Sequence, residues 1–244
     1  MAAAEHDPRE PSQYDLHRLV IYLILLGTSL CALGLSLVIW RNYSLQGMAL
    51  LNVRADTLGD YIASPLAYIF NFTLMISGLC MLLAMLALFS LRPRIRGGNY
   101  LAAVACWVGL AIILMGIFPI NDLQLHRIVA TAYLLGTFCL HCLCVYAGIN
   151  RSPLCPRPLF YLGIAGLLNA LVLMLRLEWR TLDFMPCSHA AGDTCWVAIN
   201  IWLQTLLTLG WCLLLALAML RSLRAEGHGR PATSLGRAGA IDAA

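Results

Sequence analysis

Charged side chains are scarce in this chain of 244 residues, and lysine is absent altogether. Only 11% of the residues are charged and 61% are apolar, whereas a soluble domain carries about a quarter charged residues. The sixteen basic residues are all arginines, and the formal net charge of +4 is small and scattered along the chain. This composition excludes an ordinary soluble domain. It also argues against nucleic acid as a partner, which usually requires a concentrated basic surface.

The chain also lacks several familiar patterns of targeting and catalysis. Residues 1–17 are polar and acidic, without the basic start and small-residue cleavage site of a secretory signal peptide. A P-loop, a G-x-S-x-G nucleophile elbow and an H-E-x-x-H metal helix are all missing. We therefore expect the first apolar segment to remain as a true membrane span, and no single motif names an activity.

Long apolar segments are what the sequence does contain. There are six, each close to the roughly 20 residues that a helix needs to cross a bilayer, at 19–40, 66–91, 99–120, 128–149, 159–175 and 196–220. Lipid leaves exposed backbone groups unsatisfied, so only helices and closed barrels span it. A barrel would show short alternating segments instead of continuous apolar ones. The sequence therefore predicts an all-α integral membrane bundle of six transmembrane helices.

The distribution of arginine predicts how this bundle is oriented. With six spans, eleven arginines fall on the side of the two termini and five on the other side. Because cytoplasmic loops are enriched in basic residues, both termini are predicted to be cytoplasmic, in the cell inner (plasma) membrane. The predicted organisation is a cytoplasmic tail at 1–17, a transmembrane domain at 18–222 and a disordered cytoplasmic tail at 223–244.

Acidic residues gather in the loops on the other, outer side: Asp56, Asp60, Asp122, Glu178, Asp183 and Asp193. The two inner loops carry none. One candidate site lies among these acids, where Asp122 precedes His126 and Arg127 at the start of the fourth span. A carboxylate can orient a histidine as a general base, or the two can share a metal. Alternatively, Asp122 simply caps the helix and His126 lies in the headgroup zone.

A second candidate group lies at the outer end of the second span. Ser64, Tyr68 and Asn71 have the spacing of one helical face, and Asp60 lies just before them. We expect this face to point inward from the outer surface. Asn71 then either hydrogen-bonds a neighbouring helix or lines a polar cavity that opens outward.

Two of the cysteines outside the spans lie in the same loop. Cys187 and Cys195 lie eight residues apart in the outer loop between the last two spans, with glycine and aspartate between them to turn the chain. An oxidising compartment would favour a disulfide between them, which we predict to stiffen this loop over the mouth of the bundle.

Several short motifs resemble a known family. The segment Asp60-Tyr-Ile-Ala-Ser-Pro-Leu-Ala-Tyr-Ile-Phe-Asn71 is one, and Gly116-Ile-Phe-Pro119 followed by His126-Arg-Ile-Val-Ala130 is another. Both are similar to patterns of the bacterial domain-of-unknown-function family 998, whose members have six spans. That family is more remotely similar to the Frag1/DRAM/Sfk1 group of eukaryotic membrane proteins, some linked to lipid remodelling. The resemblance to the close family implies a six-span fold and no established activity, and only the remote group suggests lipids.

Three functions are compatible with these features. The first is a lipid-handling protein with a polar site between the second, third and fourth spans; if it is an enzyme, His126, Asp122 and Asp60 would be catalytic. Asn71, Tyr68, Ser64 and Arg127 would then bind the ligand. The others are a small-molecule transporter and a non-catalytic membrane scaffold or assembly partner. No cofactor is predicted, although a metal at the Asp/His cluster is one interpretation, and membrane lipids are the expected partners.

Overall fold

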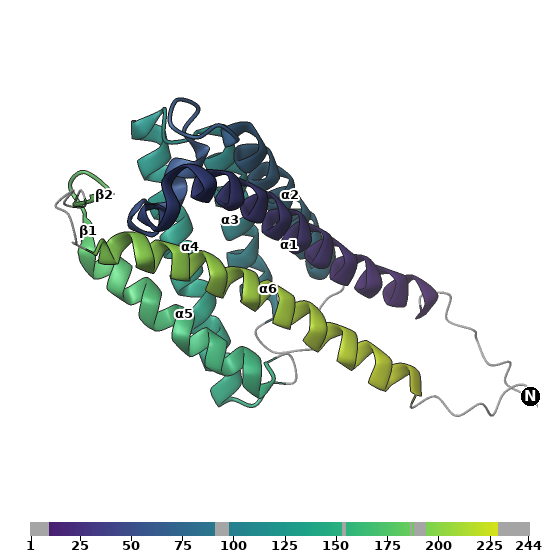
Figure 1. The fold of residues 1–244 in the computed structure, drawn as a ribbon. Coiled ribbons are helices and arrows are strands. Elements are labelled where there is room, and N and C mark those ends of the chain that lie inside the picture. Colours follow the sequence, from purple (N-terminus) through teal and green to yellow (C-terminus); the bar gives the residue numbers. More distant parts are fainter. Residues whose placement is uncertain (1–9, 91–97, 153–154, 186, 188–193, 229–244) are drawn as a thin grey trace, which may run out of the picture.

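The computed structural model describes residues 10–90, 98–152, 155–185, 187 and 194–228. Its helices are α1 (Glu10–Gln46), α2 (Ala67–Ser90), α3 (Gly98–Ile117), α4 (Leu123–Ile149), α5 (Arg157–Arg176) and α6 (Trp196–His228) (Figure 1). All six are long and apolar enough to cross a membrane. The predicted six-helix, all-α architecture is therefore confirmed, and it is that of a multi-pass membrane protein.

The two outermost helices are longer than the apolar segments that predicted them. At 1.5 Å per residue, the 37 residues of α1 span about 55 Å, well beyond the roughly 30 Å of a bilayer core. α1 begins inside the predicted tail at 1–17, and α6 continues through the first six residues of the predicted tail at 223–244. Residues 1–9 and 229–244 lie outside the described part of the chain.

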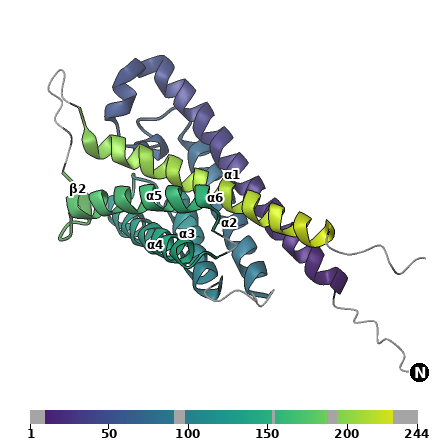
Figure 2. The ribbon, with the colours of Figure 1, turned by 90° about the horizontal axis from the view of Figure 1, so that it is seen from below.

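The helices form a closed ring. Each helix packs against the next one in sequence, and α6 packs against α1 to complete the circle. The terminal ends of α1 and α6 lie at the same end of the molecule (Figure 2). Buried apolar side chains such as Met85, Leu140 and Trp211 fill the half of the ring nearer those ends. The core is therefore concentrated in one half of the bundle.

Glycines face each other where α2 packs against α3. A Cβ atom added to Gly78 would lie 2.7 Å from the carbonyl oxygen of Gly109, and one added to Gly116 would lie 2.6 Å from that of Asn71. Small residues allow this close approach of backbones, a common way to join helices in membranes. Pro119 follows two residues after the end of α3 and helps to stop that helix.

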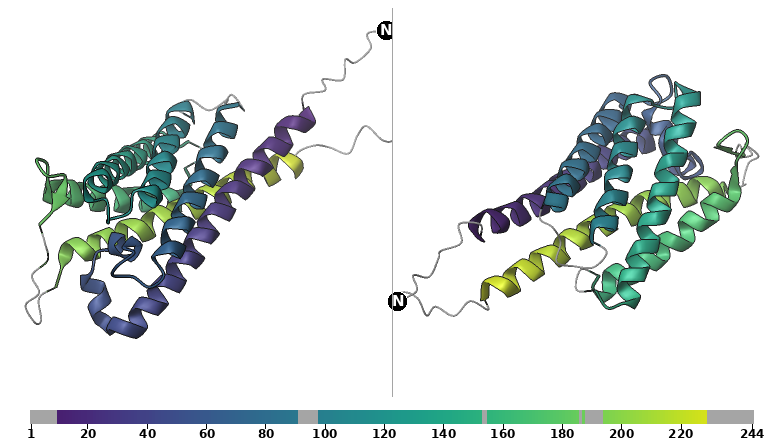
Figure 3. Two further views of the ribbon diagram at one scale, coloured as in Figure 1. Left: turned by 90° about the horizontal axis from the view of Figure 1, so that it is seen from above. Right: turned by 180° about the vertical axis from the view of Figure 1, so that it is seen from behind.

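The other end of the bundle carries three structured connections, and we call it the acidic end. The α1–α2 connection contains two short 3₁₀ helices, η1 (Gly47–Asn52) and η2 (Ala55–Gly59). The α5–α6 connection contains an antiparallel hairpin of β1 (Leu177–Glu178) and β2 (Asp183–Phe184). Residues 118–122 join α3 to α4. Figure 3 shows these connections at the end opposite the chain termini.

Candidate functional site

A charged cluster ties the three connections of the acidic end together. Arg54, between η1 and η2, donates to Asp56 from Nε and Nη2, and to Asp183 of the hairpin from Nη1 over 2.7 Å. Arg127, in the first turn of α4, donates to the other oxygen of Asp183 from Nε and Nη2, over 2.9 and 2.6 Å. Asp183 thus bridges two arginines from different elements. Charge-assisted bonds of this kind are the stronger class of hydrogen bond.

His126 extends the cluster toward α3. Its ring is buried, and Nδ1 lies 3.0 Å from the carbonyl oxygen of Phe118. A carbonyl can only accept, so Nδ1 carries the proton in this contact. Nε2 faces Asp56, 3.4 Å from Oδ2, outside hydrogen-bond geometry. Both ring nitrogens therefore face oxygen atoms of the protein itself.

In this cluster, hydrogen bonds and ion pairs affect the pKa values of the carboxyl groups more than burial does. Burial by itself would raise the pKa of Asp56, but the adjacent His126 ring and Arg54 guanidinium hold that pKa below its usual range. Burial by itself would also raise the pKa of Asp183. The hydrogen bonds from Arg54, the Phe184 amide and Arg127 outweigh burial, so the pKa of Asp183 is also lowered. Both carboxyl groups are therefore ionised at neutral pH.

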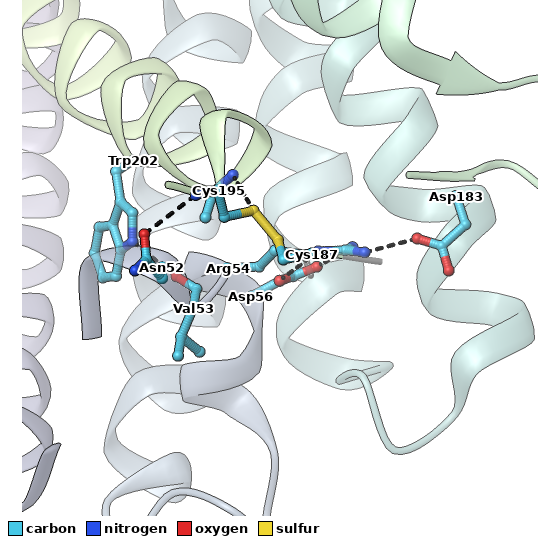
Figure 4. The surroundings of a disulfide bond; sticks show 9 residues. Asn52, Val53, Arg54, Asp56, Asp183, Cys187, Cys195 and Trp202 are labelled. Atoms are coloured by element: carbon cyan, nitrogen blue, oxygen red, sulfur yellow. Dashed lines mark hydrogen bonds and ion pairs between the residues drawn. A yellow bond between two sulfur atoms is a disulfide. The ribbon is translucent and has the colours of Figure 1, made fainter. Parts of the chain in front are cut away.

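A disulfide between Cys187 and Cys195 lies beside this cluster. Figure 4 shows it next to Arg54 and Asp56, with Asp183 joined to Arg54 on one side. Two further bonds connect α6 to the α1–α2 connection: the Cys195 amide donates to Asn52 Oδ1 over 3.2 Å, and Trp202 Nε1 donates to the Val53 carbonyl over 2.9 Å. The disulfide thus lies at a point where the α5–α6 and α1–α2 connections are already joined.

Beneath the cluster lies a partly open cavity of about 190 Å³, lined by residues of all six helices. Arg54, Asp56, His126 and Arg127 form part of its wall at the acidic end, together with Phe184 of the hairpin. Its lining reaches as deep as Met81 and Cys212, near the middle of α2 and α6. For comparison, an apolar cavity of about 150 Å³ can hold benzene. The space is therefore sufficient for a ring-sized or short aliphatic group.

The lining is mostly apolar but carries a polar strip on α6. Gln204, Thr205 and Thr208 line the cavity on successive turns, opposite Tyr133 of α4. The Tyr133 hydroxyl donates to Thr208 Oγ1 over 3.2 Å, and the Thr208 hydroxyl in turn donates to the Gln204 backbone carbonyl over 2.9 Å. A mostly apolar pocket with a few placed polar groups is the usual composition of a small-ligand site.

The chain matches one family model. Residues 29–218 match the family described as protein of unknown function (DUF998). The chain belongs to this family. The family resemblance that the Asp60–Asn71 and Gly116–Ala130 segments suggested is thereby confirmed. No curated protein and no solved structure matches the chain.

In this DUF998 protein, the three predicted catalytic residues occupy different local settings. His126 lies in the charged cluster, whereas Asp122 caps α4 by accepting from the Leu125 amide at 3.4 Å. Asp60 accepts from the Ile62 amide and from Asn121 Nδ2, each over 2.8 Å. The carboxylate beside His126 is Asp56. The predicted convergence of Asp60 and Asp122 on His126 is therefore replaced by an Asp56–His126 contact.

The predicted ligand-binding residues also separate. Ser64 and Asn71 are buried, but Tyr68 is 74% exposed, so the prediction of one shared inward face was wrong for Tyr68. α2 begins only at Ala67, so Ser64 precedes the helix and does not share a helical face with Tyr68 and Asn71. Ser64 accepts from Asn42 Nδ2, and Asn71 donates to the Gly59 carbonyl over 2.9 Å. Of this group, Asn71 and Arg127 line the cavity.

Sequence reasoning did not assign a site role to Arg54, Asp56, Asp183 or Gln204. The first three lie in loops far apart in sequence, and Asp56 and Asp183 were noted only as outer acids. Gln204 had a clearer signal, since a glutamine inside an apolar span needs a partner. Among the described residues, no three His, Cys, Asp or Glu side chains gather closely enough to hold a metal ion.

Proposed function

We propose that this DUF998 protein binds a membrane lipid, or a similar amphiphile, by holding a short apolar part of it in the cavity beneath its acidic end. The observation that carries this proposal is a mostly apolar cavity, lined by all six helices, whose wall at one end contains Arg54, Asp56, His126 and Arg127. An apolar body would lie between the helices, and a polar head would reach the charged end. This pairing of environments matches an amphiphile better than a wholly polar solute.

The charged cluster suits binding better than acid–base catalysis. The ring nitrogens of His126 face Phe118 and Asp56, at 3.0 and 3.4 Å, and both arginines are bound to carboxylates. Such a cluster closes one side of the cavity and presents charge there, but it offers no free base. We therefore assign it to closing the cavity and orienting the head of the ligand.

The proposed orientation places the acidic end on the outer face and both termini in the cytoplasm. The excess of arginine on the terminal side supports this orientation. The Cys187–Cys195 disulfide at the acidic end supports it independently, because disulfides persist in oxidising compartments. The ligand would then be drawn from the outer leaflet of the inner membrane.

Filling the cavity tests the proposal. Ala130, on α4, lines the cavity, so Ala130→Leu should occupy part of the space without adding a polar group. Wild-type protein purified from membranes should retain a lipid through detergent exchange, measured by native mass spectrometry and lipid extraction. Ala130→Leu should retain less than half as much.

The matched control is Leu206→Met, because Leu206 is 60% exposed on the surface of α6. It should retain lipid as the wild type does. Equal loss in both variants, or a wild type that retains no lipid, would contradict the proposal. Circular dichroism of each variant establishes that the helices are intact.

A further inference from the structure

The side-chain amide of Gln204 has a fixed orientation, set by a chain of hydrogen bonds. Asn169 Nδ2 on α5 donates to the carbonyl of Asn200 over 2.9 Å, and a carbonyl cannot donate. The same Nδ2 also donates to Gln204 Oε1 over 2.9 Å. The oxygen of the Gln204 amide must therefore face Asn169. Its nitrogen, Nε2, consequently points the other way.

Gln204 Nε2 has no hydrogen-bond partner within the part of the chain that the structure describes. Gln204 is only 3% exposed and lines the cavity. A buried donor without a partner is unfavourable, and more so in a bundle surrounded by lipid. Two N–H groups are therefore left for an acceptor from outside this network.

The neighbouring hydroxyl groups do not accept from this nitrogen, and they donate their own protons to the backbone. Thr205 Oγ1 donates back to the Ile201 carbonyl over 3.0 Å, and Ser77 Oγ donates to the Thr73 carbonyl over 2.6 Å. Tyr133 and Thr208 donate as described above. These protons are used within the wall, whereas the two protons on Gln204 Nε2 have no acceptor among the described residues and can serve a molecule in the cavity.

We propose that Gln204 Nε2 binds a carbonyl oxygen of an uncharged, largely apolar ligand inside the cavity. This inference rests on the proposed lipid-binding function and gives the ligand a chemical class. Gln204 is eight residues into α6, about 12 Å below its first residue. The bound oxygen therefore lies below the charged cluster, within the apolar part of the bundle.

An uncharged acceptor fits this depth better than an anion. Around Gln204 the cavity is lined by Ile201, Leu209 and Leu134 together with hydroxyl groups. The charged groups of the lining are confined to the acidic end. An ion in such surroundings is costly, whereas an ester or quinone carbonyl can accept one or both amide protons. Both sources share the same recognition chemistry.

Two probes distinguish these sources: dioctanoylglycerol, which carries ester carbonyls, and decylubiquinone, which carries ring carbonyls. Each is titrated into delipidated full-length protein in detergent and followed by native mass spectrometry. We expect at least one probe to bind, with the better probe identifying the source. Gln204→Met keeps the side-chain length but removes the donor, and should weaken that probe about 3- to 10-fold. Leu206→Met should bind as the wild type does.

Each outcome is decisive. Equal affinity in wild type and Gln204→Met would overturn the inference while leaving lipid binding intact. A wild type that retains membrane lipid but binds neither probe would also overturn the inference. A wild type that retains no membrane lipid and binds no probe would contradict the proposed function itself. If Gln204→Met does not fold, infrared spectra of wild type with a ¹³C-carbonyl probe decide. A hydrogen-bonded carbonyl shifts to lower frequency on binding, and an unshifted band overturns the inference.

Discussion

At the scale of single residues, Asp183 joins the hairpin to both the α1–α2 connection and α4. It accepts from Arg54 and from Arg127, and its own Oδ1 also accepts from the Phe184 amide. Its side chain is 17% exposed, so the pairs are neither fully solvated nor fully buried. Losing it leaves Arg127 without this carboxylate and releases the hairpin from Arg54.

Asp183→Asn should therefore lower the stability of the protein by about 1–3 kcal/mol at pH 7, less than the loss seen for fully buried pairs. The folded pKa of both Asp183 and Asp56 is depressed. Their stabilising contribution is complete above the unfolded pKa of about 4 and is lost as pH falls through the lower, folded pKa. Thermal unfolding in detergent should show a falling Tm below about pH 4, with a shallower fall in Asp183→Asn.

Glu178→Gln is the matched control, because Glu178 is an exposed residue of the same hairpin. It should change neither the Tm at pH 7 nor its fall in acid. An Asp183→Asn protein with the wild-type Tm and the wild-type acid profile would show that the cluster contributes nothing to the fold.

Residue roles were the part least accessible from sequence. The capping role of Asp122 was anticipated as one of two alternatives, because a helix start was visible directly after it. The Asp56–His126 contact was not, because it joins residues 70 positions apart through the fold of the α1–α2 connection. The predicted shared face failed in part because the helical spacing was extended back to Ser64, whereas α2 begins at Ala67.

At the scale of elements, the spans were predictable. The connections were predictable only in part: the Cys187–Cys195 disulfide was expected, but the folded form of the connections was not. Six apolar segments are sufficient to locate six helices, including the short α5, since lipid leaves few alternatives. The long connections carry no such constraint. The hairpin at 177–184 and the two 3₁₀ helices depend on long-range bonds such as Trp202 to Val53, which no local pattern encodes.

The disulfide of the α5–α6 connection makes a prediction about topology. Cys195 is buried, while Cys187 is partly exposed. A membrane-impermeant maleimide added outside intact cells should label neither residue in the wild type. Cys195→Ser frees Cys187, which should then be labelled without reduction.

Mass spectrometry of the labelled peptide locates the label. Labelling of Cys187 in the wild type without reduction would exclude the bridge. Labelling of Cys195→Ser only after the membrane is permeabilised would place the acidic end inside and reverse the proposed orientation.

At the scale of the whole molecule, the protein is a ring of six helices with two different halves. The half near the termini is filled by buried apolar side chains, whereas the half near the acidic end encloses the cavity. The connections of the acidic end hold one another through ion pairs, backbone bonds and a disulfide. This asymmetry is what makes binding within the bundle the central claim.

Photo-crosslinking tests that claim most directly. Protein in membranes containing a lipid with a diazirine on its acyl chain is irradiated, digested and mapped by mass spectrometry. Lipid inside the cavity should label inward residues such as Tyr133 and Thr208, and Ala130→Leu should suppress this labelling. Labelling confined to the outer faces, at exposed residues such as Leu203 and Leu206, and unchanged in Ala130→Leu, would contradict it.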